Sequence, residues 1–177
     1  MTFTPSNSTS ADKLVPTMIY TSQQIVWGQL STKPAIRVSS WLQSDMAPDY
    51  FYLTDTQTLL LSPGNMIAPI KSNLIHLNTG QVLAYHILPP SNEAPYYDPN
   101  EPNRKMAPVT AAIGWCQFDC RVRLAEQSDL QTFLSAQKGD FLPIYDLEMK
   151  SPVMPSLKGI KAPFALVRQN AVSFYEK

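Results

Sequence analysis

The sequence predicts an all-β protein that consists of two tandem units derived from an internal duplication. Three observations lead to this prediction. Short segments rich in β-branched and aromatic residues alternate with turn-like residues in both halves of the chain. Residues of the same type recur between the halves at a nearly constant spacing, and a proline-rich stretch separates the halves. We therefore expect a disordered N-terminus over residues 1–16, a first unit over 17–88, a connector over 89–108 and a second unit over 109–177.

The N-terminal segment reads MTFTPSNSTSADKLVP. Polar residues dominate it, and it lacks the basic start and the apolar run of a secretory signal peptide. No stretch of the chain reaches about 18 consecutive apolar residues, the length that indicates a membrane-spanning helix. We expect this segment to be disordered and the protein to be cytoplasmic, with no membrane span.

The first unit is expected to contain six strands, because alternating apolar and polar residues are bounded by turn residues. Residues 78–81, Asn-Thr-Gly-Gln, suit a turn that joins the last two strands as a tight hairpin. The expected strands cover residues 19–31, 35–42, 50–54, 58–61, 74–77 and 82–85.

The second unit repeats this arrangement and adds one short helix. Ser128 is the expected N-cap, Asp129 favours the first turn, and Leu130 and Phe133 follow at helical spacing. The expected strands cover residues 110–118, 120–125, 141–147, 164–168 and 172–175. Between the units, six of the twenty residues 89–108 are proline, which favours an extended, semi-rigid connector.

The repeat rests on the spacing of matched residues rather than on extended identity. Two pairs lie 86 positions apart, one pair lies 91 apart and three pairs lie 90 apart. In that order they are Gly28 with Gly114, Arg37 with Arg123, Asp55 with Asp146, Lys71 with Lys161, Val82 with Val172, and Tyr85 with Tyr175.

The order of elements in each unit resembles Sm-like and SH3-like small barrels. Each unit has a strand that ends in aspartate, Leu-Thr-Asp at 53–55 and Ile-Tyr-Asp at 144–146, and then two short strands around a turn. The layout is also similar to bacterial families of unknown function that carry such a duplication. The resemblance implies two tandem small barrels. The Arg-Gly pair that Sm-like RNA binders carry in the closing turn is missing from residues 76–80 and 166–170.

Two sets of residues are candidates for function. Tyr96, Tyr97 and Met106 are large apolar side chains in the proline-rich connector, where they need a surface to cover them, so we expect them to contact a partner or the chain's own units. The basic residues Arg37, Arg121, Arg123 and Lys105 are the second set. Arg37 and Arg123 are expected to pair with a carboxylate such as Asp55 or Asp146, and the alternative is that the four residues form a nucleic-acid-binding face.

Sequence motifs for catalysis or for cofactor binding are not found. Only two histidines, His76 and His86, are available as bases, and the chain has no phosphate-binding glycine motif. The spacing of Cys116 and Cys120 is not that of common zinc sites. We expect no enzyme activity, no cofactor and no metal.

The leading hypothesis is a non-enzymatic binding or scaffold protein that self-associates, as a homo-oligomer or within a larger protein assembly, because open edge strands pair unless they are blocked. One alternative is an Sm-like nucleic-acid-binding module. The other is a module that binds a small molecule in the cleft between the two barrels.

Overall fold

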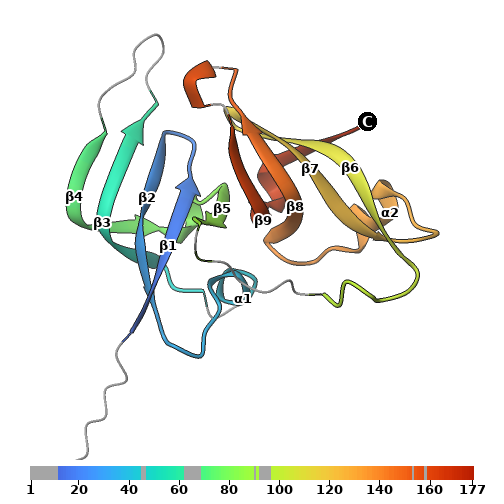
Figure 1. The fold of residues 1–177 in the computed structure, drawn as a ribbon, viewed down its shortest axis with the longest axis horizontal. Coiled ribbons are helices and arrows are strands. Elements are labelled where there is room, and N and C mark those ends of the chain that lie inside the picture. Colours follow the sequence, from blue (N-terminus) through green and yellow to red (C-terminus); the bar gives the residue numbers. More distant parts are fainter. Residues whose placement is uncertain are drawn as a thin grey trace, which may run out of the picture.

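A computed structural model describes residues 12–44, 47–61, 69–89, 91, 97–152, 154–157 and 159–177. Its ten strands form one antiparallel sheet in the order β10-β6-β7-β8-β9-β5-β1-β2-β3-β4 (Figure 1). The strands are β1 (Lys13–Tyr20), β2 (Gln24–Thr32), β3 (Tyr50–Leu60), β4 (Ile70–Asn78), β5 (Ala84–Ile87), β6 (Arg104–Ile113), β7 (Cys116–Ala125), β8 (Phe141–Lys150), β9 (Ile160–Arg168) and β10 (Val172–Glu176).

Two short α-helices and three 3₁₀ turns complete the described structure. They are α1 (Val38–Leu42), α2 (Leu130–Ala136), η1 (Thr79–Gln81), η2 (Pro155–Leu157) and η3 (Gln169–Ala171). The predicted helix in the second unit is confirmed as α2, and its cap is Asp129 rather than Ser128, because a carboxylate oxygen of Asp129 accepts the backbone N–H of Thr132 at 2.7 Å. The all-β prediction is confirmed as well.

Both halves of the sheet have the same strand order. The first half, β1 to β5, runs β5-β1-β2-β3-β4, and the second half, β6 to β10, runs β10-β6-β7-β8-β9. Asp55 in β3 and Asp146 in β8 both have a positive φ, 50° and 48°, at the point where each strand changes register against its neighbour. The spacing of 91 between these aspartates therefore matches equivalent positions in the two halves.

The spacing of 86 predicted for the start of each unit is wrong. Thr17 pairs with Gly28, and Val109 pairs with Cys120 at the same place in the second half, so Gly28 corresponds to Cys120. Gly114 instead has a φ of 56° in the two-residue turn between β6 and β7. Gly114 permits a positive φ in a turn, whereas Gly28 permits close packing between strands. The residue type alone does not distinguish these two roles.

One predicted strand and two predicted hairpins are also wrong. Residues 35–42 were expected as a strand, but Val38 to Leu42 form α1, which buries Val38, Ser39 and Leu42 on one face. The hairpins expected at 74–85 and 164–175 do not form, because β4 pairs only with β3 while β5 pairs with β1 and β9. In the first half Asn78 accepts the N–H of Gly80 and closes η1, which redirects the chain across the sheet.

The structure does not show the two closed barrels that the resemblance implies. Instead, β5 of the first half pairs with β9 of the second, with Ala84 opposite Val167 and Tyr85 opposite Leu166, so that the sheet continues from one half into the other. The described residues form two hydrophobic cores, which we call the first core, built mostly from the first half, and the second core, built mostly from the second half. Phe141 and Leu166 of the second half belong to the first core. The second core includes four residues of the first half, Tyr20, Ile25, Leu59 and Ala84.

Strand boundaries differ from those predicted at both unit starts. β1 begins at Lys13, inside the segment expected to be disordered, and β6 begins at Arg104, inside the expected connector. The rest of the expected disordered segment, apart from Asp12, lies outside the described residues.

Gly28 allows β2 to lie close against β3. A Cβ at this position would come within 2.7 Å of Thr56 Cγ2 and 2.8 Å of the Thr54 carbonyl oxygen. We expect Gly28→Ala to lower the free energy of unfolding by about 1–3 kcal/mol, because the backbone carbonyl cannot move away cheaply. Urea denaturation of both proteins measures this difference.

The matched control is Gly139→Ala, whose Cβ would meet nothing nearer than the Phe141 carbonyl oxygen at 3.8 Å. Equal stability of the two variants would contradict the proposed close packing at Gly28.

Candidate functional site

The connector folds back on the second half through a cluster around Arg123. The Arg123 guanidinium lies 4.4 Å from the centre of the Tyr97 ring and donates to Glu101 at 2.6 Å. Tyr97 meets the ring of Tyr145 edge to face, with the ring centres 5.1 Å apart. Arg104 also donates to Glu101 at 3.0 Å, and the two arginines lower the pKa of the Glu101 carboxyl. A planar guanidinium suits this combination of stacking and ion pairing.

Among the predicted contact residues, Tyr97 is thus engaged by its own chain. Met106 is half-buried in β6, opposite Arg123 in the strand register. Tyr96 lies outside the described residues. The connector therefore presents Tyr97 to β7 and β8 rather than to solvent, as in one of the two arrangements that the sequence allowed.

The four predicted basic residues do not gather on one face. Arg37 is the residue before α1 in the first half. Arg121 and Arg123 are two residues apart in β7 and lie on its outer face. Arg121 lies 4.0 Å from Asp146, and Arg123 binds Glu101. Lys105 is opposite Leu124, a core residue, and so belongs to the other face of the sheet. The expected equivalence of Arg37 and Arg123 is wrong, because one precedes a helix and the other is within a strand.

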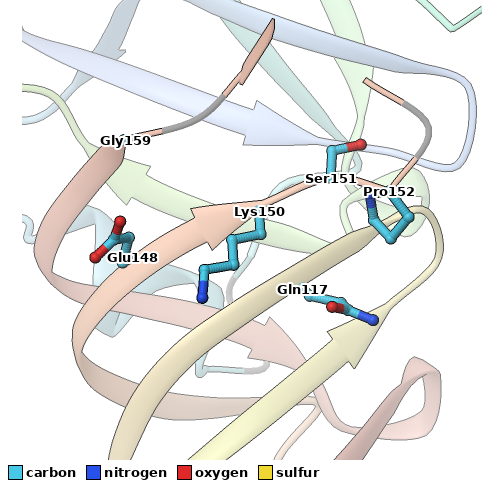
Figure 2. A pocket seen from close by; sticks show the side chains of 6 residues that line it. All are labelled: Gln117, Glu148, Lys150, Ser151, Pro152 and Gly159. Atoms are coloured by element: carbon cyan, nitrogen blue, oxygen red, sulfur yellow. The ribbon is translucent and has the colours of Figure 1, made fainter. Parts of the chain in front are cut away.

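Cavities lined by described residues lie within the halves. Each of four such cavities takes its lining from one half alone. The first has a volume of about 470 Å³ and is lined by Gln117, Glu148, Lys150, Ser151, Pro152 and Gly159, with Lys150 and Glu148 side chains standing on the same strand (Figure 2).

The charged groups beside this cavity already have partners. Lys150 donates to Asp119, Lys177 donates to the same carboxylate at 2.7 Å, and Lys161 lies 3.4 Å from Glu148. The two lysines, with the Thr110 hydroxyl, hold the pKa of Asp119 well below its usual range. This arrangement ties the C-terminal residue to β7, which is a structural role.

Polar groups are buried where the two halves meet. The Tyr20 hydroxyl lies 3.0 Å from His86 Nε2, and His86 Nδ1 lies 3.0 Å from the Ile87 carbonyl oxygen. Because a carbonyl only accepts, Nδ1 carries the proton and Nε2 accepts from Tyr20. Across the same contact, the Trp115 indole N–H donates to the Thr21 carbonyl oxygen at 2.9 Å. Burial lowers the pKa of His86 and keeps it neutral.

The two cysteines are free and buried in β7. Burial raises the pKa of the Cys116 thiol well above its usual range and that of Cys120 to about 11. Both thiols are therefore protonated near neutral pH, and neither has the thiolate character of a nucleophile.

Exposed apolar side chains concentrate at the two open edges of the sheet. Among the described residues, six large apolar side chains are exposed, and only Leu14 in β1 belongs to a strand away from these edges. The other five are Tyr50 and Tyr52 in β3, Ile70 and Leu74 in β4, and Tyr175 in β10. None of these residues is among the predicted contact residues, although residues 50–53, Tyr-Phe-Tyr-Leu, are apolar on both faces of the expected strand.

The outer face of β3 and β4 forms a continuous patch. Tyr52 is opposite His76, and their rings meet edge to face with centres 5.0 Å apart. Tyr50 and Leu74 are exposed on the same face, at the ends of this group. We call Tyr50, Tyr52, Leu74 and His76 the β3–β4 patch.

Comparison with protein-family models, curated proteins and solved structures finds no match to this chain. Within the part of the chain that the structure describes, no helix is long and apolar enough to cross a lipid bilayer.

Protonation of His86 should weaken the contact between the halves. Since burial lowers its pKa in the folded state, the stabilisation is present above the ordinary histidine pKa of about 6.5 and is lost as the pH falls below it. We expect the free energy of unfolding to fall from pH 7.5 to pH 5, and to fall less in His86→Gln. Urea denaturation at a series of pH values measures both slopes.

Identical pH profiles for wild type and His86→Gln would show that His86 does not carry this effect.

Proposed function

We propose that this chain is a non-enzymatic binding or scaffold protein of the cytoplasm that self-associates through the open edges of its sheet. The observation that carries the proposal is the placement of exposed apolar side chains at β10 and along β3 and β4. An edge strand offers unpaired N–H and C=O groups to another strand, and apolar side chains beside it add a hydrophobic contribution.

The composition of the edges supports pairing. Natural proteins protect edge strands with lysine, proline or inward-pointing charges. β4 contains one lysine, Lys71, and no proline, and β10 contains one charged residue, Glu176. The neutral net charge of the chain adds little repulsion between copies.

The repeated strand order supports a further part of the proposal, namely that the two halves are tandem small-barrel repeats of one ancestral unit. The paired positive-φ residues Asp55 and Asp146 and the equal place of the register changes in β3 and β8 favour this origin. The end strands β10 and β4 correspond to β5 and β9, which pair with each other inside the chain, and this arrangement suits assembly from repeated contacts.

Charged substitutions on the β3–β4 patch should prevent self-association. We expect wild type to have a solution mass above the 19.8 kDa of one chain at both low and high salt, and Tyr50→Lys/Leu74→Lys to have the mass of one chain. Two exposed ammonium groups at the contact are costly to bury without partners. Light scattering with absorbance at 260 and 280 nm measures mass and nucleic-acid content together.

Leu14→Lys is the matched control, because Leu14 is exposed and apolar but lies in an inner strand. It should leave the mass unchanged. A wild-type monomer would refute the proposal, and a monomer whose 260 nm absorbance is removed by salt would favour the nucleic-acid alternative.

A further inference from the structure

The two halves contact each other through β5 and β9. The corresponding strands, β10 and β4, lie at the two ends of the sheet and make no such contact within the described residues. In the strand registers, β8 and β9 correspond to β3 and β4, so that Phe141 corresponds to Tyr50 and Leu166 to His76. Phe141 and Leu166 lie on the outer face of the second half, yet they are only 5% and 0% exposed. They are buried because they pack into the first core, on the first half.

The corresponding outer face of the first half has no such cover among the described residues. Tyr50 is 46% exposed, and His76 is exposed beside it. Phe141 and Leu166 are thus buried where the other half lies against them, whereas Tyr50 and His76 at the equivalent positions are exposed.

The strands that receive this contact show the same difference. Tyr85 is opposite Ile19 in the first half, and Phe174 is opposite Ala111 at the equivalent place in the second. The predicted match of Tyr85 with Tyr175 is therefore wrong by one position. In β5, which β9 covers, Tyr85 is fully buried. In β10, which ends the sheet, Phe174 is only half-buried and its neighbour Tyr175 is 60% exposed. β10 lies at one end of the sheet and β4 at the other.

We infer that the partner of this protein is a second copy of the same chain, whose β10 adds antiparallel to β4 and repeats the internal contact between β5 and β9. This inference rests on the proposed self-association and adds its direction and register. Transfer of the internal pairs, Ala84 with Val167 and Tyr85 with Leu166, places Ser173 opposite Leu77 and Phe174 opposite His76. Glu176 of one copy is then opposite Leu74 of the next.

Such a contact is head to tail, because it joins different surfaces of two identical chains. Each copy keeps one free edge of either kind, and the assembly grows until it closes into a ring or extends as a filament. The β3–β4 patch of one copy occupies the place that Phe141 and Leu166 have in the internal contact, over the half-buried Val172 and Phe174 of the other.

The contact between copies should be weaker than the internal one. Arg168 donates to the Val82 and Thr79 carbonyl oxygens across the internal contact, at 2.6 and 2.7 Å, and stacks on Phe141. Its counterpart in β4 is Asn78, which is shorter and carries no charge. We expect copies to separate on dilution while each chain remains folded.

The test uses two full-length variants that each add one exposed cysteine, Leu74→Cys and Glu176→Cys, mixed and exposed to mild oxidation. Both native residues are exposed, so the variants should fold, and the native Cys116 and Cys120 are buried. Directly opposite residues of an antiparallel pair lie within the Cα separation that a disulfide requires. The expected result is a product of twice the chain mass in the mixture and little or none with either variant alone.

Asn73→Cys mixed with Glu176→Cys is the matched control, because a shift of one residue turns the thiol to the opposite face of β4. It should form at least about ten-fold less product, since its thiols are not brought together. Equal cross-linking in this control would overturn the register. Cross-linking of either variant alone at the level of the mixture would overturn the head-to-tail direction in favour of a symmetric pair.

The result for wild type separates the two proposals. If wild type self-associates and the Leu74→Cys and Glu176→Cys mixture gives no product, the head-to-tail contact is wrong while self-association stands. If wild type has the mass of one chain at the concentration of the cross-linking experiment, both fail.

Discussion

The contact between β5 and β9 holds this molecule together as one sheet. Its backbone ladder is short, with only two directly paired residues on each strand, so most of its strength must come from the side chains around it. Phe141 and Leu166 enter the first core, Tyr20 and Ala84 enter the second, and Arg168 closes the contact with two hydrogen bonds to carbonyl groups. Units of about 70 residues bury limited apolar surface alone, and the shared cores compensate for this.

This contact also explains the use of polar groups in the structure. The neutral His86 and the Tyr20 hydroxyl satisfy each other where the halves meet, so the buried polar atoms do not oppose the packing around them. Arg123, Glu101 and Tyr97 fasten the connector to the second half. The ion pairs around Glu101 thus hold this segment of the chain against β7.

Equivalent surfaces in the two halves have different environments, and this difference leads from fold to proposed function. Phe141 and Leu166, on the outer face of β8 and β9, are buried within the chain, whereas the β3–β4 patch is exposed together with Tyr175 at the opposite edge. A surface suited to burial in one half remains apolar in the other. Self-association by the same contact accounts for that composition without requiring a ligand or a catalytic group.

The sequence by itself determined the all-β class, most strand positions, the helix after Asp129 and the match of Asp55 with Asp146, because alternation, capping and a turn-forming aspartate are local properties. Tertiary structure decided which strands are neighbours: β5 pairs with β1 and β9 rather than with β4, and residues 38–42 form a helix that fits the first core. It also decided the candidate site. Tyr50 and Phe141 look alike in sequence, and only the position of the other half determines that one is exposed and the other buried.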